Sequence, residues 1–293
     1  MMDRARRVPL ALSRRSVMTG VACLSLLPAT ATAHQDKDWT FDKYGRAMQA
    51  SGRRTDLTER TFEAVRQKRA HALQQLETYL AGKFGNADLD VMRAFSQVPR
   101  EYYHFNYSSH GSFAREAYDW YPRPWAIGFG SALSDFLGQA YMTQLARPKA
   151  GETALEIGTG SGYQISILSR IVRKACSIEI IEPLGTPVGR IFKPLGFDNI
   201  ESRVGDGYFG WPQEKDGFDI IMVTCVAQHV PPDLLKQLKP GSGRLIIPVG
   251  QPFKREQVLY VFSKDADGRI QSRRDVGVYF IPMTGRIARG RSA

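Results

Sequence analysis

The sequence predicts an α/β protein built on a doubly wound, mostly parallel sheet. From residue 152 onward, short apolar segments alternate with segments whose apolar residues recur at helical spacing. This alternation is typical of parallel sheets that are covered by helices on both faces. A glycine-rich turn, Gly158-Thr159-Gly160-Ser161-Gly162, joins the first strand to the first helix. Near the carboxyl end, segments 257–263 and 269–281 alternate around Ala266-Asp267-Gly268 and predict a terminal antiparallel hairpin.

The first 33 residues predict an export signal rather than a part of the fold. Ser13-Arg14-Arg15-Ser16-Val17-Met18-Thr19 resembles a twin-arginine signal, and a weakly apolar run over 17–27 precedes the small-residue site Ala31-Thr32-Ala33. The run is too short to cross a bilayer, which takes about twenty residues. We therefore expect a signal peptide over 1–33, a periplasmic location and no stable membrane insertion. A disordered basic arm and a cytoplasmic location are the alternatives.

A helical extension is expected over 34–86, before the main domain at 87–293. Apolar residues recur at helical spacing from Thr55 to Lys83, with Asp56 as a candidate N-cap and Gly85 as a stop. The predicted apolar face consists of Phe62, Val65, Ala72, Leu76 and Leu80. A second helix is predicted over 87–97, and the aromatic segment 101–130 predicts an irregular layer over the domain.

The elements of the main domain follow from its periodicity. Strands are predicted over 152–157, 176–181, 200–204, 218–224 and 243–249. Helices are predicted over 162–173, 185–195 and 231–238.

Composition narrows the classes of ligand. Of the formal charge of +11, residues 1–33 hold +4, and the remaining +7 is spread along the chain apart from arginines near the C-terminus and the pair Arg273-Arg274, so nucleic-acid binding is not expected. Three cysteines cannot build a disulfide framework, and the five histidines show no paired ligand spacing. No metal site is predicted.

The glycine turn indicates which nucleotide the domain binds. A dinucleotide fingerprint needs a third glycine one residue later, and no Lys-Ser/Thr follows for a phosphate-binding loop. An acidic residue two places before Gly158-x-Gly160-x-Gly162 resembles the S-adenosylmethionine motif of Rossmann-like class I methyltransferases. The alternative is a glycine-rich turn without a ligand. We therefore expect S-adenosyl-L-methionine as the cofactor.

Ligands of such sheets bind at the carboxyl ends of the strands, beside the switch point. Glu179 ends the second strand, where an acid typically holds ribose hydroxyls. Asp206 follows the third strand and is expected to accept from an adenine amino group. The expected cofactor site comprises Glu156, Gly158, Thr159, Gly160, Gly162, Glu179, Asp206, Gly207 and Thr224.

A longer series of motifs, in order from about Ala87 to Thr284, resembles the protein-L-isoaspartate O-methyltransferases. It comprises Val98-Pro99-Arg100, Ile127-Gly128-Phe129-Gly130, Leu155 to Gln164, Gly205-Asp206-Gly207-x-x-Gly210-Trp211-Pro212, Gln237 to Gly241, Arg244 to Gly250 and Phe280 to Thr284. The resemblance implies an S-adenosylmethionine-dependent protein-L-isoaspartate (D-aspartate) O-methyltransferase that acts on proteins or peptides bearing isoaspartyl residues. A monomer is expected.

The resemblance also implies where the acceptor binds. Ser134 is expected to donate to the substrate oxygen, and Ile127, Gly128, Ser131, Ala132 and Leu133 to bind the substrate. The substrate carboxylate has a pKa of roughly 3 to 4 and is ionised at neutral pH, so no general base is needed. The reading of Ser134 as a helix N-cap stays open.

Two other functions remain open from the sequence. The family's Gln-Thr-Ile-Ser-x-Pro is replaced here by Ser131-Ala132-Leu133-Ser134-Asp135-Phe136, and an inward-pointing Asp135 would repel a carboxylate. A methyltransferase for a different carboxylate, peptide or small molecule is therefore one alternative. A donor-binding protein with little turnover is the other alternative, because S-adenosylmethionine is made in the cytoplasm and an exported protein would be separated from its supply.

Overall fold

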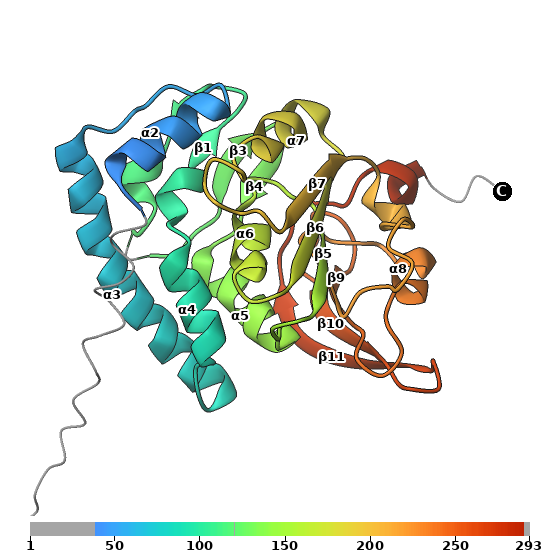
Figure 1. Cartoon of the computed structure of the whole chain (residues 1–293). Coiled ribbons are helices and arrows are strands. Elements are labelled where there is room, and N and C mark those ends of the chain that lie inside the picture. The colour runs from blue at the N-terminus through green and yellow to red at the C-terminus, as the bar shows by residue number, and fades with distance from the viewer. Residues whose placement is uncertain (1–38, 120, 290–293) are drawn as a thin grey trace, which may run out of the picture.

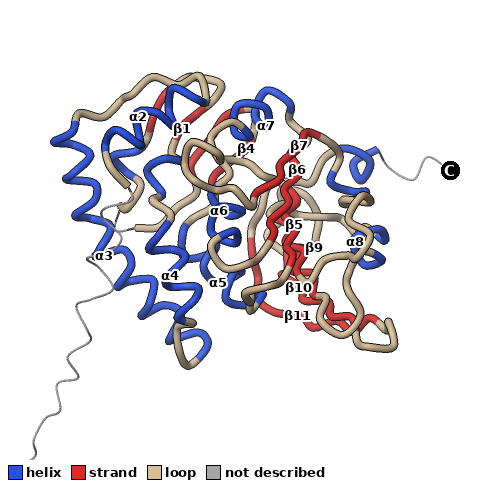
Figure 2. Tube along the Cα trace, viewed as in Figure 1, coloured by secondary structure: helices blue, strands red, loops and turns tan. Residues whose placement is uncertain are grey.

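A seven-stranded sheet forms the centre of the protein, and the computed structural model describes residues 39–119 and 121–289 (Figures 1 and 2). The predicted signal peptide lies outside these residues. The strand order is β11-β10-β9-β8-β5-β6-β7. Its members are β5 (Thr153–Ile157), β6 (Lys174–Glu179), β7 (Ile200–Val204), β8 (Ile220–Val223), β9 (Arg244–Val249), β10 (Gln257–Lys264) and β11 (Ile270–Val278). The predicted sheet and terminal hairpin are confirmed.

The strand order reverses at β5, which pairs in parallel with both β6 and β8. The chain first runs from β5 through β6 to β7 and then returns to the other side of β5 through β8 and β9. β9 to β10 and β10 to β11 are antiparallel. A crevice at the carboxyl ends of β5 and its neighbours is the usual ligand position in such a sheet.

Three of the four helices around the sheet, at 163–169, 182–189 and 232–236, are shorter than the periodicity predicts, whereas the helix at 136–146 was not predicted. The four helices are α5 (Phe136–Ala146), α6 (Tyr163–Ser169), α7 (Glu182–Gly189) and α8 (Pro232–Lys236). α7 begins earlier than the predicted start at 185, with Pro183 in its first turn. It ends at Gly189 and contains Pro187, which cannot donate a backbone hydrogen bond to the preceding turn.

The N-terminal extension consists of α2 (Phe41–Ala50) and α3 (Glu59–Phe84), followed by α4 (Leu89–Gln97). The predicted apolar face of α3 is buried, and Gly85 ends the helix in a left-handed conformation with φ of 87°. The predicted N-cap is wrong: Thr58 caps α3, whereas Asp56 accepts a hydrogen bond from the Tyr44 hydroxyl. Figure 1 shows these helices on one side of the molecule, and their apolar residues share a core with α5 and α6.

Segment 99–133 forms the irregular layer that was predicted, with two small hairpins. The elements are η1 (Arg100–Tyr103), β1 (Phe105–Asn106), β2 (Gly111–Ser112), η2 (Ala114–Glu116), β3 (Trp125–Gly128) and β4 (Ser131–Leu133). Two further short turns are η3 (Gly207–Phe209) and η4 (Gly285–Arg289). Within the described residues, no helix combines the length and apolarity needed to span a membrane.

Candidate functional site

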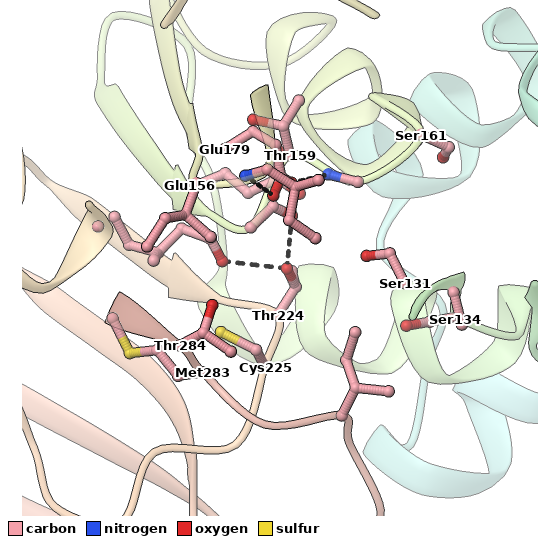
Figure 3. Close-up of a pocket in the computed structure, with 18 of the residues that line it drawn as sticks. Ser131, Ser134, Glu156, Thr159, Ser161, Glu179, Thr224, Cys225, Met283 and Thr284 are labelled. Carbon is pink, nitrogen blue, oxygen red and sulfur yellow. Dashed lines mark hydrogen bonds between the residues drawn. The ribbon is translucent and has the colours of Figure 1, made fainter. Parts of the chain in front are cut away.

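The glycine turn between β5 and α6 lies at the switch point of the sheet. All three of its glycines have positive φ, at 96° for Gly158, 53° for Gly160 and 85° for Gly162. Thr224 holds the turn from β8, because its hydroxyl lies 2.7 Å from the Gly158 carbonyl oxygen and 3.1 Å from that of Ile157 (Figure 3). A Cβ on Gly158 would come within 2.7 Å of that hydroxyl oxygen. Glycine is therefore required here for both conformation and space.

One cavity opens beside this turn and gathers most of the predicted site. From the expected cofactor residues it is lined by Glu156, Gly158, Thr159, Gly160, Glu179, Gly207 and Thr224. From the expected acceptor residues it is lined by Ser131, Ala132, Leu133 and Ser134. The donor and acceptor sites, which were predicted from segments far apart in the sequence, thus lie in one cavity.

The Glu179 carboxylate is buried and is positioned by two backbone N–H groups. Gly160 N donates to Oε2 at 2.8 Å and Ile181 N donates to Oε1 at 3.0 Å. Burial raises the pKa of Glu179, and these backbone hydrogen bonds act in the opposite direction. Each oxygen keeps a second lone pair. The geometry fits a pair of neighbouring hydroxyls, such as those of a ribose.

Glu156 is the second buried carboxylate of the cavity. Its Oε2 accepts from the Ser177 hydroxyl at 2.8 Å, and Ser177 lies 2.7 Å from the Thr159 hydroxyl. Burial raises the pKa of Glu156 well above its usual value. A cation bound nearby would favour the ionised form of this carboxylate. Glu156 therefore suits a ligand with a sulfonium and an ammonium group, the charges that S-adenosylmethionine carries.

Three predicted site residues support the cavity from behind and do not line it. Gly162 faces α7 and the segment after it, where an added Cβ would lie 2.9 Å from the Phe192 ring and 3.0 Å from Val188. Ile127 is part of the buried core. Gly128 has φ of 102°, and a Cβ there would lie 2.6 Å from the Ser108 hydroxyl. The two glycines shape their turns and Ile127 packs in the core, so the predicted contact of these three residues with ligands stays a prediction.

Asp206 also lies outside the cavity lining. Its Oδ1 accepts from Tyr208 N at 2.9 Å, which caps η3, and its Oδ2 accepts from Arg286 N at 2.7 Å. Gly285 packs so closely that an added Cβ would lie 2.5 Å from Oδ2. The C-terminal segment thus covers the carboxylate that was expected to meet an adenine amino group. Its neighbour Gly207 does line the cavity.

The acceptor segment ends at the N-terminus of α5, where Asp135 is the N-cap. Asp135 Oδ1 accepts from Gly138 N at 2.8 Å. This contact excludes the reading of Ser134 as the cap. It also holds the carboxylate of Asp135 at the helix end, and Asp135 is not among the residues that line the cavity. Figure 3 shows the hydroxyls of Ser131 and Ser134 directed into the cavity.

Arg100 is a buried residue that sequence reasoning did not assign to the site. Its Nη2 donates to the Ser134 carbonyl oxygen at 2.7 Å, and its Nη1 donates to Gln139 Oε1 at 2.7 Å. Its guanidinium lies 5.1 Å from the centre of the Tyr163 ring. Burial lowers the pKa of Arg100. The motif Val98-Pro99-Arg100 was the available signal.

Sequence reasoning also did not assign to the site several residues that complete the lining, although some of them lie in the family motifs. They come from α5, α6, the end of β8 and the chain after β11, and include Gln139, Gln164, Cys225, Ile281, Pro282, Met283 and Thr284. Burial raises the pKa of the Cys225 thiol, so Cys225 lines the cavity as an uncharged thiol.

Comparison with known proteins agrees with this geometry. The family model of protein-L-isoaspartate(D-aspartate) O-methyltransferase matches residues 72–288, which begins within α3 and exceeds half of the chain. Protein-L-isoaspartate O-methyltransferase 2 of Syntrophobacter fumaroxidans is 41% identical over 238 residues, covering 80% of this chain and 92% of the relative. Protein-L-isoaspartate O-methyltransferase 1 of Nitrosospira multiformis is 40% identical over 254 residues, covering 85% and 99%.

Solved structures show the same architecture. A protein-L-isoaspartate O-methyltransferase superposes with a TM-score of 0.63 at 25% identity, covering 75% of this chain and 67% of the other. A Plasmodium falciparum structure with bound S-adenosyl-L-homocysteine superposes with a TM-score of 0.58 at 24% identity, covering 72% and 97%. The chain belongs to the protein-L-isoaspartate(D-aspartate) O-methyltransferase family.

Proposed function

We propose that this chain transfers the methyl group of S-adenosyl-L-methionine to the free carboxylate of L-isoaspartyl residues in damaged proteins. The observation that carries the proposal is the shared cavity, where the acceptor segment Ser131–Ser134 faces the glycine turn and Glu179. The family match and the relatives at about 40% identity support the same reaction. The enzyme is thus a protein carboxyl methyltransferase that serves protein repair.

The chain's own residues account for binding and alignment. Glu179 presents its free lone pairs to a diol, and Glu156 supplies negative charge opposite a cationic ligand. When bound, S-adenosyl-L-methionine supplies a methyl group on a positively charged sulfur. The Ser134 hydroxyl donates a hydrogen bond to one oxygen of the acceptor carboxylate. The other oxygen is then free to attack the methyl carbon. Proximity and orientation of this kind lower the barrier without a proton transfer.

No general base is required, because the acceptor is already ionised at neutral pH. A carboxyl group with a pKa of roughly 3 to 4 is almost fully deprotonated at pH 7. In the transfer, a carboxylate oxygen forms a bond to the methyl carbon, and the carbon–sulfur bond breaks with its electron pair moving to sulfur. The nitrogen of the amide bond that links the isoaspartyl side chain to the next residue then attacks the ester carbonyl and methanol leaves, which gives a succinimide that water opens in part to normal aspartate.

The decisive experiment is methyl transfer from labelled S-adenosyl-L-methionine to an isoaspartyl peptide and to its normal aspartyl twin. Transfer confined to the isoaspartyl peptide is the expected result. Label on other carboxylates or peptides, with none on the isoaspartyl peptide, would favour a different acceptor. The observation that motivates this alternative is Ala132, which stands where the family typically has a threonine. If the protein binds the donor but transfers methyl to no acceptor, the result would instead favour the donor-binding protein with little turnover.

We further propose that the protein is exported to the periplasm by a twin-arginine route and works there as a monomer. Arg14-Arg15 and the small-residue site at 31–33 support export. Fusion of residues 1–40 to a folded reporter tests export, with Arg14→Lys and Arg15→Lys together as the control. Light scattering tests the monomer.

A further inference from the structure

Two phenylalanines at the cavity have a backbone conformation that phenylalanine rarely adopts. Among the described residues, four non-glycine residues have positive φ, and two of these are Phe129 at 52° and Phe253 at 59°. Both line the cavity, and both are exposed, at 43% for Phe129 and 74% for Phe253. Positive φ is an outlier for a bulky residue and strains the backbone. Neither burial nor backbone preference accounts for these side chains.

Phe129 stands at the tip of the hairpin β3–β4, beside the acceptor segment. The residues on either side of it are glycines, and its N–H donates to the Ser108 hydroxyl at 2.9 Å. Ser108 also fills the space where Gly128 lacks a Cβ. The turn is therefore held by the preceding loop, while Phe129 itself stays partly exposed at the cavity. Ser131 follows two residues later in β4.

Phe253 stands in the loop between β9 and β10, at the carboxyl edge of the sheet. The base of this loop is fixed, because Gly250 N donates to the Ala227 carbonyl oxygen at 3.0 Å and Gln257 is buried. The Gln257 side chain exchanges two hydrogen bonds with the backbone of Phe280, at 2.6 and 3.2 Å. The loop thus presents an exposed ring from a rigid support.

The position of the two phenylalanines beside the acceptor site indicates which part of the substrate they contact. The cavity that they line also contains Ser131 to Ser134, where the acceptor carboxylate is proposed to bind. An isoaspartyl residue is part of a polypeptide, so the residues on either side of it must leave the cavity past its rim. Exposed apolar surface at a binding site marks a contact with another apolar group.

We propose that Phe129 and Phe253 form an aromatic clamp for the side chains that flank the isoaspartyl residue, which makes large apolar neighbours preferred over glycine. This inference rests on the proposed function and adds a specificity to it. The two rings enclose apolar side chains of the bound polypeptide. The acceptor carboxylate itself is recognised deeper in the cavity, so the clamp changes the choice of substrate and leaves the chemistry unchanged.

The test compares kcat/KM for isoaspartyl peptides that differ only in their flanking residues, either glycine or leucine on both sides. Because partial burial of a leucine side chain on an aromatic surface is worth about 1.4 kcal/mol, the wild type should prefer the leucine peptide by about tenfold. Phe129→Ala and Phe253→Ala should each reduce this preference, and the double variant should remove it. Phe253→Leu should retain most of it.

Controls separate the clamp from the fold and from the reaction. Leu89→Ala removes an exposed apolar side chain on α4, 83% exposed and outside the cavity lining, and should keep the preference. Donor affinity of the alanine variants should equal that of the wild type. A wild type without preference, or a double variant that keeps it, overturns the clamp while the reaction stands. Failure of every isoaspartyl peptide to accept methyl overturns the proposed function, and the clamp with it.

Discussion

The Nη2 group of Arg100 donates a hydrogen bond to the carbonyl oxygen of Ser134 at 2.7 Å, across 34 residues of sequence. This contact ties a fully buried cation to the residue that is proposed to hold the acceptor. The same guanidinium also donates to Gln139, which lines the cavity from α5. Arg100 thus positions the acceptor segment without touching the substrate.

Arg100→Lys should therefore lower kcat for methyl transfer by about tenfold or more, because an ammonium cannot reproduce the two-pronged contact of a guanidinium. Donor affinity, measured by calorimetry, should change less than twofold, on the order of 0.4 kcal/mol. The variant should also lose about 1–3 kcal/mol of unfolding free energy if one acceptor is left without a partner. An unchanged kcat in a folded variant would remove the positioning role.

Ser134→Ala removes the hydroxyl that is expected to donate to the acceptor carboxylate. A hydrogen bond to a charged group contributes about 1.5–3 kcal/mol, so kcat/KM for an isoaspartyl peptide should fall by about 10- to 100-fold. Donor affinity should stay the same. Ser134→Thr retains a hydroxyl and should recover part of the loss. Equal activity of the alanine variant would show that another group holds the acceptor.

Asp135→Ala tests whether this carboxylate acts on the helix or on the substrate. Loss of the N-cap of α5 should reduce the unfolding free energy by about 1 kcal/mol. Transfer to an isoaspartyl peptide should be nearly unchanged, since the carboxylate is bonded to Gly138 N and lies outside the cavity lining. Asp135→Asn keeps an acceptor at the cap and should restore the stability. A clear gain in transfer by both variants would instead indicate repulsion between Asp135 and the substrate.

The raised pKa of Glu156 predicts that donor binding depends on pH. In the free protein, burial favours the protonated carboxyl, whereas a bound cation favours the carboxylate and lowers its pKa. Binding should therefore release a proton, and donor affinity should rise as the pH rises through the pKa of the free protein. Calorimetry in two buffers of different ionisation enthalpy measures this release.

Glu156→Gln is the matched control for that titration. The variant should bind the donor more weakly at a pH where the wild-type carboxyl is ionised, and should lose most of the pH dependence of donor binding. The same slope in wild type and variant would assign the proton to another group.

Asp219 predicts a second pH effect, on stability rather than on binding. Burial alone would raise its pKa, but hydrogen bonds from Lys239, Ser242 and Thr153 N lower it to about 2. Because the pKa is lower in the folded than in the unfolded chain, the stabilisation is present above about pH 4 and is lost as the pH falls towards 2.

Asp219→Asn should thus be less stable than the wild type by about 1–2 kcal/mol at pH 7, allowing for solvent screening, and the difference should shrink below pH 4. Urea unfolding at pH 7 and pH 3 measures both values. Asp267→Asn, whose ion pair with Arg269 is exposed, should show no such change. A constant difference at both pH values would contradict the linkage.

The sequence by itself determined the sheet, the glycine turn and the identity of the family. These features depend on local patterns: alternating periodicity, glycines where positive φ is needed, and a series of motifs in fixed order. Gly158 illustrates the point, since its φ of 96° belongs to the region that favours glycine. Residues whose backbone shapes the turn could be predicted because neighbouring residues in the chain dictate it.

Only the tertiary structure decided where the polar side chains point and what they contact. Asp135 caps α5 in place of Ser134, the C-terminal segment covers Asp206, and Arg100 reaches Ser134 from a distant turn. Phe253 comes to the cavity from a loop that the motifs did not mark. Such contacts join segments far apart in the chain, so their direction depends on how the layers pack together, and short-range sequence patterns carry no information about that packing.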